Sequence, residues 1–146
     1  MKKIWIAGLL ILALCLSLAA CGGSSAEEPA VDLNTVDGKL AARGFAEQDL
    51  LLNAGDSISI DEDGDLILHS AASFEEAAKA VYDACAKAAD DGLVRDYMSE
   101  EPMEFAFEET ILYFGYEHGA AFKYVVFSPI WSDQETGIND YLLQWG

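Results

Sequence analysis

The clearest pattern along the chain is a stripe of small and apolar residues that predicts an amphipathic helix over residues 73–91. Ser73 followed by Glu76 is the sequence signature of a capping box at a helix N-terminus. Gly92 stands where a helix commonly ends. The apolar stripe recurs at alternating steps of four and three residues, as one face of an α-helix requires, and consists of Phe74, Ala78, Val81, Cys85 and Ala88.

Two shorter elements are predicted before this helix. Residues 32–43 carry apolar side chains at positions i, i+3 and i+7, which predicts a short helix that ends near Gly44. Residues 57–60 and 66–69 alternate polar and apolar side chains on either side of an acidic interruption. This pattern predicts a β-hairpin with Asp63-Gly64 at its turn.

The C-terminal third of the chain predicts strands, and its last 50 residues hold 12 of the 16 aromatic residues. Residues 104–108 alternate apolar and acidic side chains, and residues 111–116 are apolar on both faces. This change from one apolar face to two predicts a single strand that is half exposed at its start and covered on both faces at its end. Residues 122–127 predict a second strand, ended by Pro129, and residues 138–145 a third.

Together these elements predict a single α+β domain over residues 31–146. Its order is an N-terminal helix, a β-hairpin, the amphipathic helix and a C-terminal three-stranded antiparallel meander. We expect the helices to pack on one face of the sheet. The 126 residues from Cys21 onward are enough for one domain with its own core.

The N-terminus has the layout of a secretory signal rather than of a folded element. Two lysines precede an apolar run over residues 4–16, and Leu18-Ala19-Ala20-Cys21 follows. These four residues resemble the lipobox of bacterial lipoprotein precursors. The resemblance implies that the Cys21 thiol receives a diacylglyceryl group and that a peptidase cleaves between Ala20 and Cys21. In many bacteria the new amine is acylated as well. Residues 1–20 are then a signal peptide.

An uncleaved transmembrane helix is the alternative interpretation. Residues 4–20 supply 17 consecutive uncharged residues, at the lower edge of the range of about 17–25 that spans a bilayer. Small residues just before a cysteine favour the lipoprotein, because a spanning helix does not need them. Residues 21–30 then predict a flexible lipidated tether. We expect the domain on the extracytoplasmic face of the cell membrane, anchored through lipid on Cys21.

The charge of the chain narrows the range of partners. With 26 acidic and eight basic residues the net charge is −18, and loss of Lys2 and Lys3 with the signal peptide leaves −20. Nucleic acid is excluded as a partner, because phosphate binding needs positive charge. An anionic membrane surface should repel the domain and hold it away from the lipid. A basic partner or cations are favoured in the long-range field, although the simpler interpretation is a solubilising surface.

The acidic turn of the predicted hairpin is a candidate cation site. Asp61, Asp63 and Asp65 cluster there, so the segment is either a plain turn or a weak, non-EF-hand metal site. The EF-hand spacing fails, because it places Ser59 and Ser70 at positions 1 and 12, where acidic ligands are required. The plain turn is favoured.

Trp131 is the candidate binding residue, within a predicted loop over residues 130–134. A tryptophan beside polar residues can stack on a sugar or on a partner protein. Alternatively, Trp131 caps the open end of the core.

The sequence contains no phosphate-binding loop, nucleophile elbow or zinc-binding motif. The two histidines, His69 and His118, are expected at the surface, at strand ends or turns. We therefore expect no enzyme activity and no cofactor. The predicted function is a membrane-tethered extracytoplasmic lipoprotein that acts as an interaction module for a protein or a cell-wall component. The alternative is a carrier of a small ligand or ion, with a pocket between the sheet and the helices.

Overall fold

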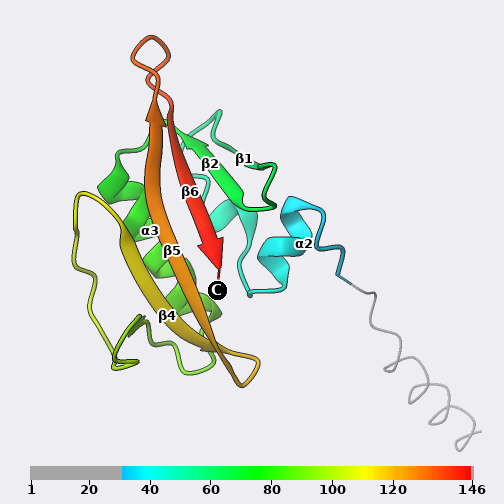
Figure 1. Ribbon diagram of the computed structural model, residues 1–146, viewed down its shortest axis with the longest axis vertical. Coiled ribbons are helices and arrows are strands. Elements are labelled where there is room, and N and C mark those ends of the chain that lie inside the picture. Colours follow the sequence, from blue (N-terminus) through cyan, green and yellow to red (C-terminus); the bar gives the residue numbers. More distant parts are fainter. Residues whose placement is uncertain (1–30, 146) are drawn as a thin grey trace, which may run out of the picture. The chain divides into compact units, whose positions relative to one another are not determined.

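The computed structural model describes residues 31–145 (Figure 1). The predicted signal peptide, lipobox and tether lie outside these residues. None of the helices within residues 31–145 has the length and apolar character needed to cross a bilayer. In chain order the elements are α2 (Val36–Ala41), the 3-10 helix η1 (Glu47–Asp49), β1 (Ser57–Ile60), β2 (Leu66–Ser70), α3 (Phe74–Ala88), β3 (Arg95–Asp96), β4 (Leu112–His118), β5 (Ala121–Ser132) and β6 (Asn139–Trp145).

The strands form one six-stranded antiparallel sheet in the order β1-β2-β6-β5-β4-β3. The predicted architecture, with a three-stranded C-terminal meander, was therefore wrong. The described part of the chain is mostly sheet, with few helices. Strand β2 pairs with β6 from Leu66 opposite Leu143 to Ser70 opposite Asn139, so the β1–β2 hairpin extends the C-terminal strands. These two strands are far apart in sequence, and the pattern of neither strand identifies its partner.

Helix α3 begins where the sequence predicts but ends earlier. The Ser73 hydroxyl oxygen accepts a hydrogen bond from the Glu76 backbone N–H at 3.2 Å, and the Glu76 carboxylate accepts one from the Ser73 N–H at 2.9 Å. This reciprocal pair is the predicted capping box. At the other end Ala89 is the C-cap, so the last helical residue, Ala88, lies four residues before Gly92.

The N-terminal helix α2 is shorter than predicted and has only six residues. Thr35 caps it by accepting a hydrogen bond from the Gly38 N–H at 3.1 Å. A Cβ atom at position 38 would lie 1.8 Å from the backbone oxygen of Asp32. The preceding turn therefore requires glycine at a position where glycine weakens the helical pattern.

Residues 104–108 do not form a strand, contrary to the prediction. They belong to the connection between β3 and β4, which runs beside α3. The ring of Phe105 lies 5.6 Å from that of Tyr82, and the ring of Phe107 lies 5.7 Å from that of Phe74. The alternation of apolar and acidic residues therefore reflects an extended segment that packs on a helix rather than a strand in a sheet.

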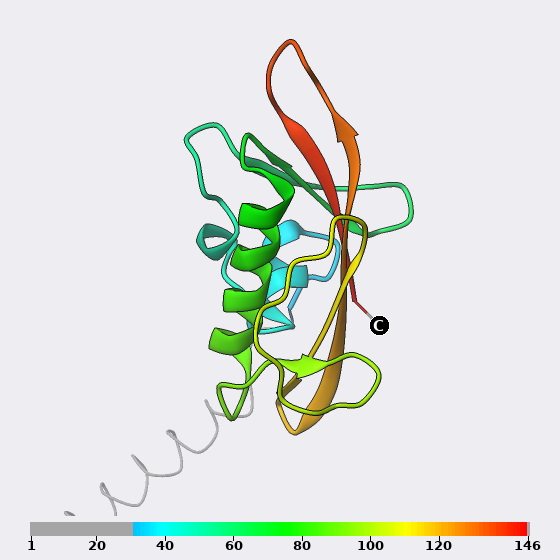
Figure 2. The ribbon, with the colours of Figure 1, turned by 90° about the vertical axis from the view of Figure 1, so that its left-hand side faces the viewer.

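Strand β5 continues beyond Pro129, where the sequence predicted its end. The register between β5 and β6 shifts between Pro129 and Trp131, which leaves an extra residue in β5. Such a β-bulge accommodates proline, which lacks the N–H that a regular ladder needs. Trp131 consequently lies in a strand opposite Asp140, not in a loop. The β5–β6 hairpin projects beyond the rest of the sheet (Figures 1 and 2).

Helix α3 covers one face of the sheet, and the core lies between them (Figure 2). The helix contributes small side chains, which allow a close approach to the sheet. Cys85 is fully buried among them, as the sequence predicted. The larger buried side chains come mainly from the strands and include Leu66, Leu68, Phe114, Tyr116, Val125, Phe127 and Leu143.

Candidate functional site

The largest candidate surface is the face of the sheet that points away from α3, which we call the open face. Cross-strand partners share a face of an antiparallel sheet, so the register identifies its members. Its apolar members are Ile67, Tyr113, Phe122, Tyr124, Val126, Trp131 and Leu142. Its polar members include Ser57, Ser59, His69, Glu117, Ser128, Asp140 and Gln144.

This open face combines exposed aromatic side chains with few charges. Trp131 is 66% exposed and Tyr113 is 46% exposed. By the same register its charged members are Glu117, Asp140 and Arg95, whereas the whole chain has 26 acidic residues. The centres of protein interfaces are likewise poor in charge and enriched in tyrosine and tryptophan.

A cluster of aromatic rings occupies the end of the open face over β4 and β5. The ring of Tyr97, just after β3, lies 5.2 Å from that of Tyr113 and 4.9 Å from that of Tyr124. Phe122 lies 4.9 Å from Tyr124 on the other side. The Tyr124 hydroxyl donates to the Glu100 carboxylate at 3.2 Å. Desolvation and this hydrogen bond both raise the pKa of Tyr124, so its hydroxyl stays protonated and available as a donor.

A row of hydrogen-bonded polar side chains crosses the other end of the open face. His69 on β2 lies between Ser59 on β1 and Asp140 on β6. The Ser59 hydroxyl oxygen is 2.7 Å from His69 Nε2, and Asp140 Oδ1 is 2.6 Å from His69 Nδ1. Because a carboxylate only accepts, Nδ1 carries a proton, and Nε2 is the ring atom paired with the Ser59 hydroxyl. We call these three residues the polar row.

The polar row has the order of groups found in Ser-His-Asp catalytic triads. Acyl transfer also needs N–H donors aimed at the oxyanion that forms on the attacked carbonyl. Ser59 lies on a strand, so its side chain stands perpendicular to the sheet while its backbone N–H lies within the sheet plane. That N–H cannot reach an oxyanion formed above the Ser59 hydroxyl. The Ser59 N–H therefore does not supply the oxyanion donor that a triad requires.

Trp131 borders a hollow of about 380 Å³ beside the polar row. His69, Asp140 and Ser57 form one side of this hollow, and residues of the β5–β6 loop form the other. With two thirds of its surface exposed, Trp131 does not cap the core. Its ring is instead available to stack on a bound group, next to the hydrogen-bonding side chains of the polar row.

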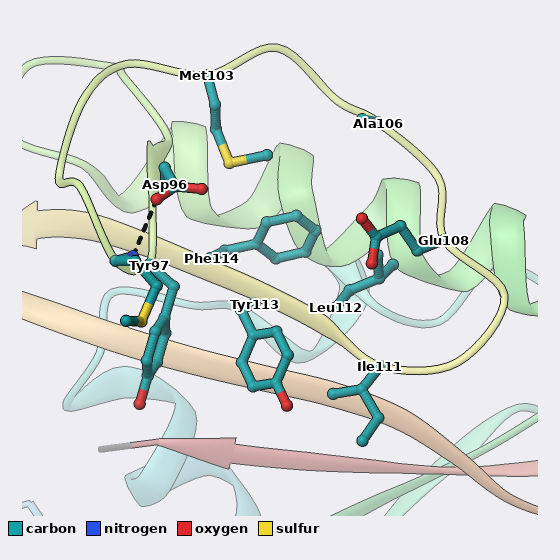
Figure 3. Close-up of a pocket in the computed structure, with 10 residues that line it drawn as sticks. Asp96, Tyr97, Met103, Ala106, Glu108, Ile111, Leu112, Tyr113 and Phe114 are labelled. Carbon is teal, nitrogen blue, oxygen red and sulfur yellow. Dashed lines mark hydrogen bonds between the residues drawn. The ribbon is translucent and has the colours of Figure 1, made fainter.

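A second hollow, a cleft of about 500 Å³, lies between β4 and residues 103–111 (Figure 3). Met103 and Glu108 lie on the connecting segment, and Tyr113 and Phe114 lie on β4. The alternative function, a carrier, predicts its pocket between the sheet and the helices. That layer is filled by the buried core side chains.

Two acidic residues of the β1–β2 turn, Asp61 and Asp65, accept hydrogen bonds from the protein itself. Asp61 Oδ1 accepts from the backbone N–H groups of Asp63 at 3.0 Å and Asp65 at 2.9 Å. Asp65 Oδ2 accepts from the Gln144 side chain at 2.7 Å. Among residues 31–145 there is no group of three or more histidine, cysteine or acidic side chains arranged to hold a metal ion.

The most deeply buried ionisable side chains belong to the core and not to either hollow. Burial raises the pKa of the Cys85 thiol, which therefore stays protonated and unreactive at neutral pH. Burial also raises the pKa of Tyr116, whose hydroxyl donates to the backbone oxygen of Arg43 at 2.9 Å. His118, expected at the surface, lies 2.7 Å through Nδ1 from the Ala88 oxygen, at the end of α3.

The sequence predicted Trp131 as a candidate site residue but missed the polar row beside it. The hairpin pattern by itself places Ser59 near His69. Asp140 joins them only through the pairing of β2 with β6. No protein-family model matches this chain, and no curated protein or solved structure is significantly similar to it.

Proposed function

We propose that the chain is a lipid-anchored lipoprotein on the extracytoplasmic face of a bacterial membrane. Its domain acts as a non-enzymatic module that binds a partner protein or a cell-wall component through the open face. The observation that carries this proposal is the composition of that face: aromatic and aliphatic side chains with few charges, in a chain of net charge −18. Burial of such a face against a partner costs little desolvation of charge.

The anchor is supported by Leu18-Ala19-Ala20-Cys21 at the end of the apolar N-terminal run. A diacylglyceryl group supplies two acyl chains, which is what stable anchoring requires. The acidic domain is repelled by anionic lipid, so the open face remains available to a partner at the cell surface.

Photo-crosslinking in the native cell tests the open face. A benzophenone amino acid replaces Val126, which lies on the open face, and in the matched control it replaces Glu75, which is exposed on α3. We expect adducts from position 126 and none from position 75. A protein partner gives discrete larger bands, and a wall partner gives adducts that muramidase releases. Absence of adducts at 126, or equal adducts at both positions, contradicts the proposal.

Metabolic labelling with palmitate tests the anchor. We expect Cys21→Ser to abolish labelling and to leave the precursor uncleaved, whereas the control Cys85→Ser keeps both. Labelling that survives Cys21→Ser contradicts the anchor without affecting the crosslinking result.

A further inference from the structure

The outer edge of β4 has backbone groups without a strand partner. Along an antiparallel strand these groups point alternately to one side and to the other. The Glu117 carbonyl oxygen accepts from the Asp90 N–H at 2.7 Å, on the side away from β5. Backbone groups two residues apart along a strand point to the same side. Those of Gly115 and Tyr113 therefore also point away from β5. Gly115 is paired with Arg95 of β3. Within residues 31–145, Tyr113 has no strand partner at this edge.

Strand β3 stops short of Tyr113 because a tight turn follows Asp96. The Asp96 Oδ1 atom accepts from the N–H groups of Met98 at 2.9 Å and Ser99 at 2.7 Å. The chain next approaches β4 as residues 103–111, whose Phe105 side chain packs on α3 rather than on the edge of β4. The cleft of about 500 Å³ separates this segment from β4 (Figure 3).

We infer that this cleft binds an extended segment of a partner polypeptide, which adds to the outer edge of β4 as a further strand. The inference deepens the proposed function and rests on it, because it names the chemistry of the partner beside the open face. An extended strand rises about 3.3 Å per residue, lies about 4.8 Å from its neighbour and fills a layer about 10 Å thick. The cleft therefore holds about three residues of such a strand.

The walls of the cleft indicate which peptide sequences it prefers. Met103, Ile111 and Phe114 provide apolar surface for alternate side chains of the added strand. Two acidic residues, Asp96 and Glu108, are among the residues that line the cleft. Apolar residues that alternate with lysine or arginine therefore complement the cleft better than acidic sequences do.

Selection of peptides from a random library tests this inference. Phage-displayed twelve-residue peptides are selected against the full chain in detergent micelles, and the enriched peptides are synthesised and titrated by fluorescence polarisation. We expect enrichment of alternating apolar and basic residues. Failure to enrich any peptide, or enrichment of acidic peptides, overturns the inference.

Two variants at Tyr113 then test whether the backbone is recognised. Tyr113→Pro removes the outward N–H but no hydrogen bond to β5, and proline is tolerated at such edge positions. Tyr113→Ala is the matched control, since it removes the same ring and keeps the N–H. We expect Tyr113→Pro to raise the Kd of the selected peptides at least tenfold above that of Tyr113→Ala. Equal Kd values in the two variants overturn the inference.

Methylation of the peptide backbone makes the same test with the protein unchanged, in case Tyr113→Pro unfolds the domain. Two peptides are compared, one N-methylated at its odd-numbered positions and the other at its even-numbered positions. Only one of these sets of N–H groups faces β4, so only one of the two peptides should lose at least tenfold in affinity. Equal affinity of the two peptides overturns the inference. One outcome is that peptide binding depends on the Tyr113 N–H while crosslinking at position 126 fails. That result would reject the open face as a binding surface but keep the cleft as a peptide-binding site.

Discussion

His69 and Asp140 face each other across β2 and β6, with 2.6 Å between the imidazole Nδ1 atom and a carboxylate oxygen. This contact joins the N-terminal hairpin to the C-terminal strands on the open face. We expect Asp140→Ala to lower the free energy of unfolding by about 1 kcal/mol, because it removes one partly buried hydrogen bond. Urea denaturation measures the loss, and Glu135→Ala in the exposed β5–β6 loop is the control. An equal loss in both variants would show that the contact contributes nothing specific.

Ser59 completes the polar row, and its reactivity separates an ordering role from a catalytic one. Because the Ser59 N–H lies in the plane of the sheet, it is not aimed at an oxyanion formed beside the hydroxyl. We expect hydrolysis of p-nitrophenyl acetate by the full chain to be unchanged in Ser59→Ala. A tenfold or larger drop in the variant would make Ser59 a nucleophile and would reopen the enzyme hypothesis.

The Asp56 carboxylate links the segment before β1 to the end of β2 through hydrogen bonds. Partial burial alone would raise its pKa, but hydrogen bonds outweigh burial and hold the pKa below the ordinary value of 3.8. The donors are the Ser70 hydroxyl, at 2.7 Å, and the backbone N–H groups of Leu52, Asn53 and Ala71. We expect Asp56→Asn to cost about 1–2 kcal/mol of unfolding free energy at pH 7, because a partly exposed carboxylate loses several charged hydrogen bonds.

The pH dependence of this loss has a definite sign. Because folding lowers the pKa of Asp56, its stabilisation is complete above the unfolded value of 3.8 and disappears as the pH falls through the folded value. The difference between wild type and Asp56→Asn should therefore shrink below pH 3.8. Urea denaturation over a pH series measures it, with Glu62→Gln in the exposed turn as the control. A difference that stays constant down to pH 2 contradicts the assignment.

Gly115 provides room for the ring of Phe122 on the open face. A Cβ atom at position 115 would lie 2.3 Å from Cζ of Phe122. We expect Gly115→Ala to lower the free energy of unfolding by about 1–2 kcal/mol, because the ring must move. In a Phe122→Ala background the same change should cost little, and a double-mutant cycle measures the difference. Equal costs in both backgrounds would place the strain elsewhere.

The elements that the sequence predicted well are stabilised by local contacts. The capping box of α3 joins Ser73 and Glu76, three residues apart, so the sequence shows both partners together. The β1–β2 hairpin likewise turns at Gly64, whose φ of 86° suits glycine. Residues 104–108 show the limit of such patterns. Their side chains alternate as in a strand, but an extended segment that packs on α3 shows the same alternation.

The candidate site depends on contacts that no local pattern records. Ser59 and His69 are ten residues apart within one hairpin, whereas His69 and Asp140 are 71 residues apart. Asp140 reaches His69 because β2 pairs with β6. Several half-buried strands could pair with β2, and tertiary packing rather than local sequence determines which one does. Trp131 likewise lies in a strand rather than in the predicted loop. Strand β5 continues past the bulge at Pro129 because β6 pairs with it there.

The two strands at the ends of the sheet are its shortest, with four residues in β1 and two in β3, while the twelve residues of β5 lie in its interior. Long, flat edges are the templates on which β-proteins join into fibrils. Outside the cleft beside Tyr113, the short end strands therefore leave other copies little edge on which to extend the sheet.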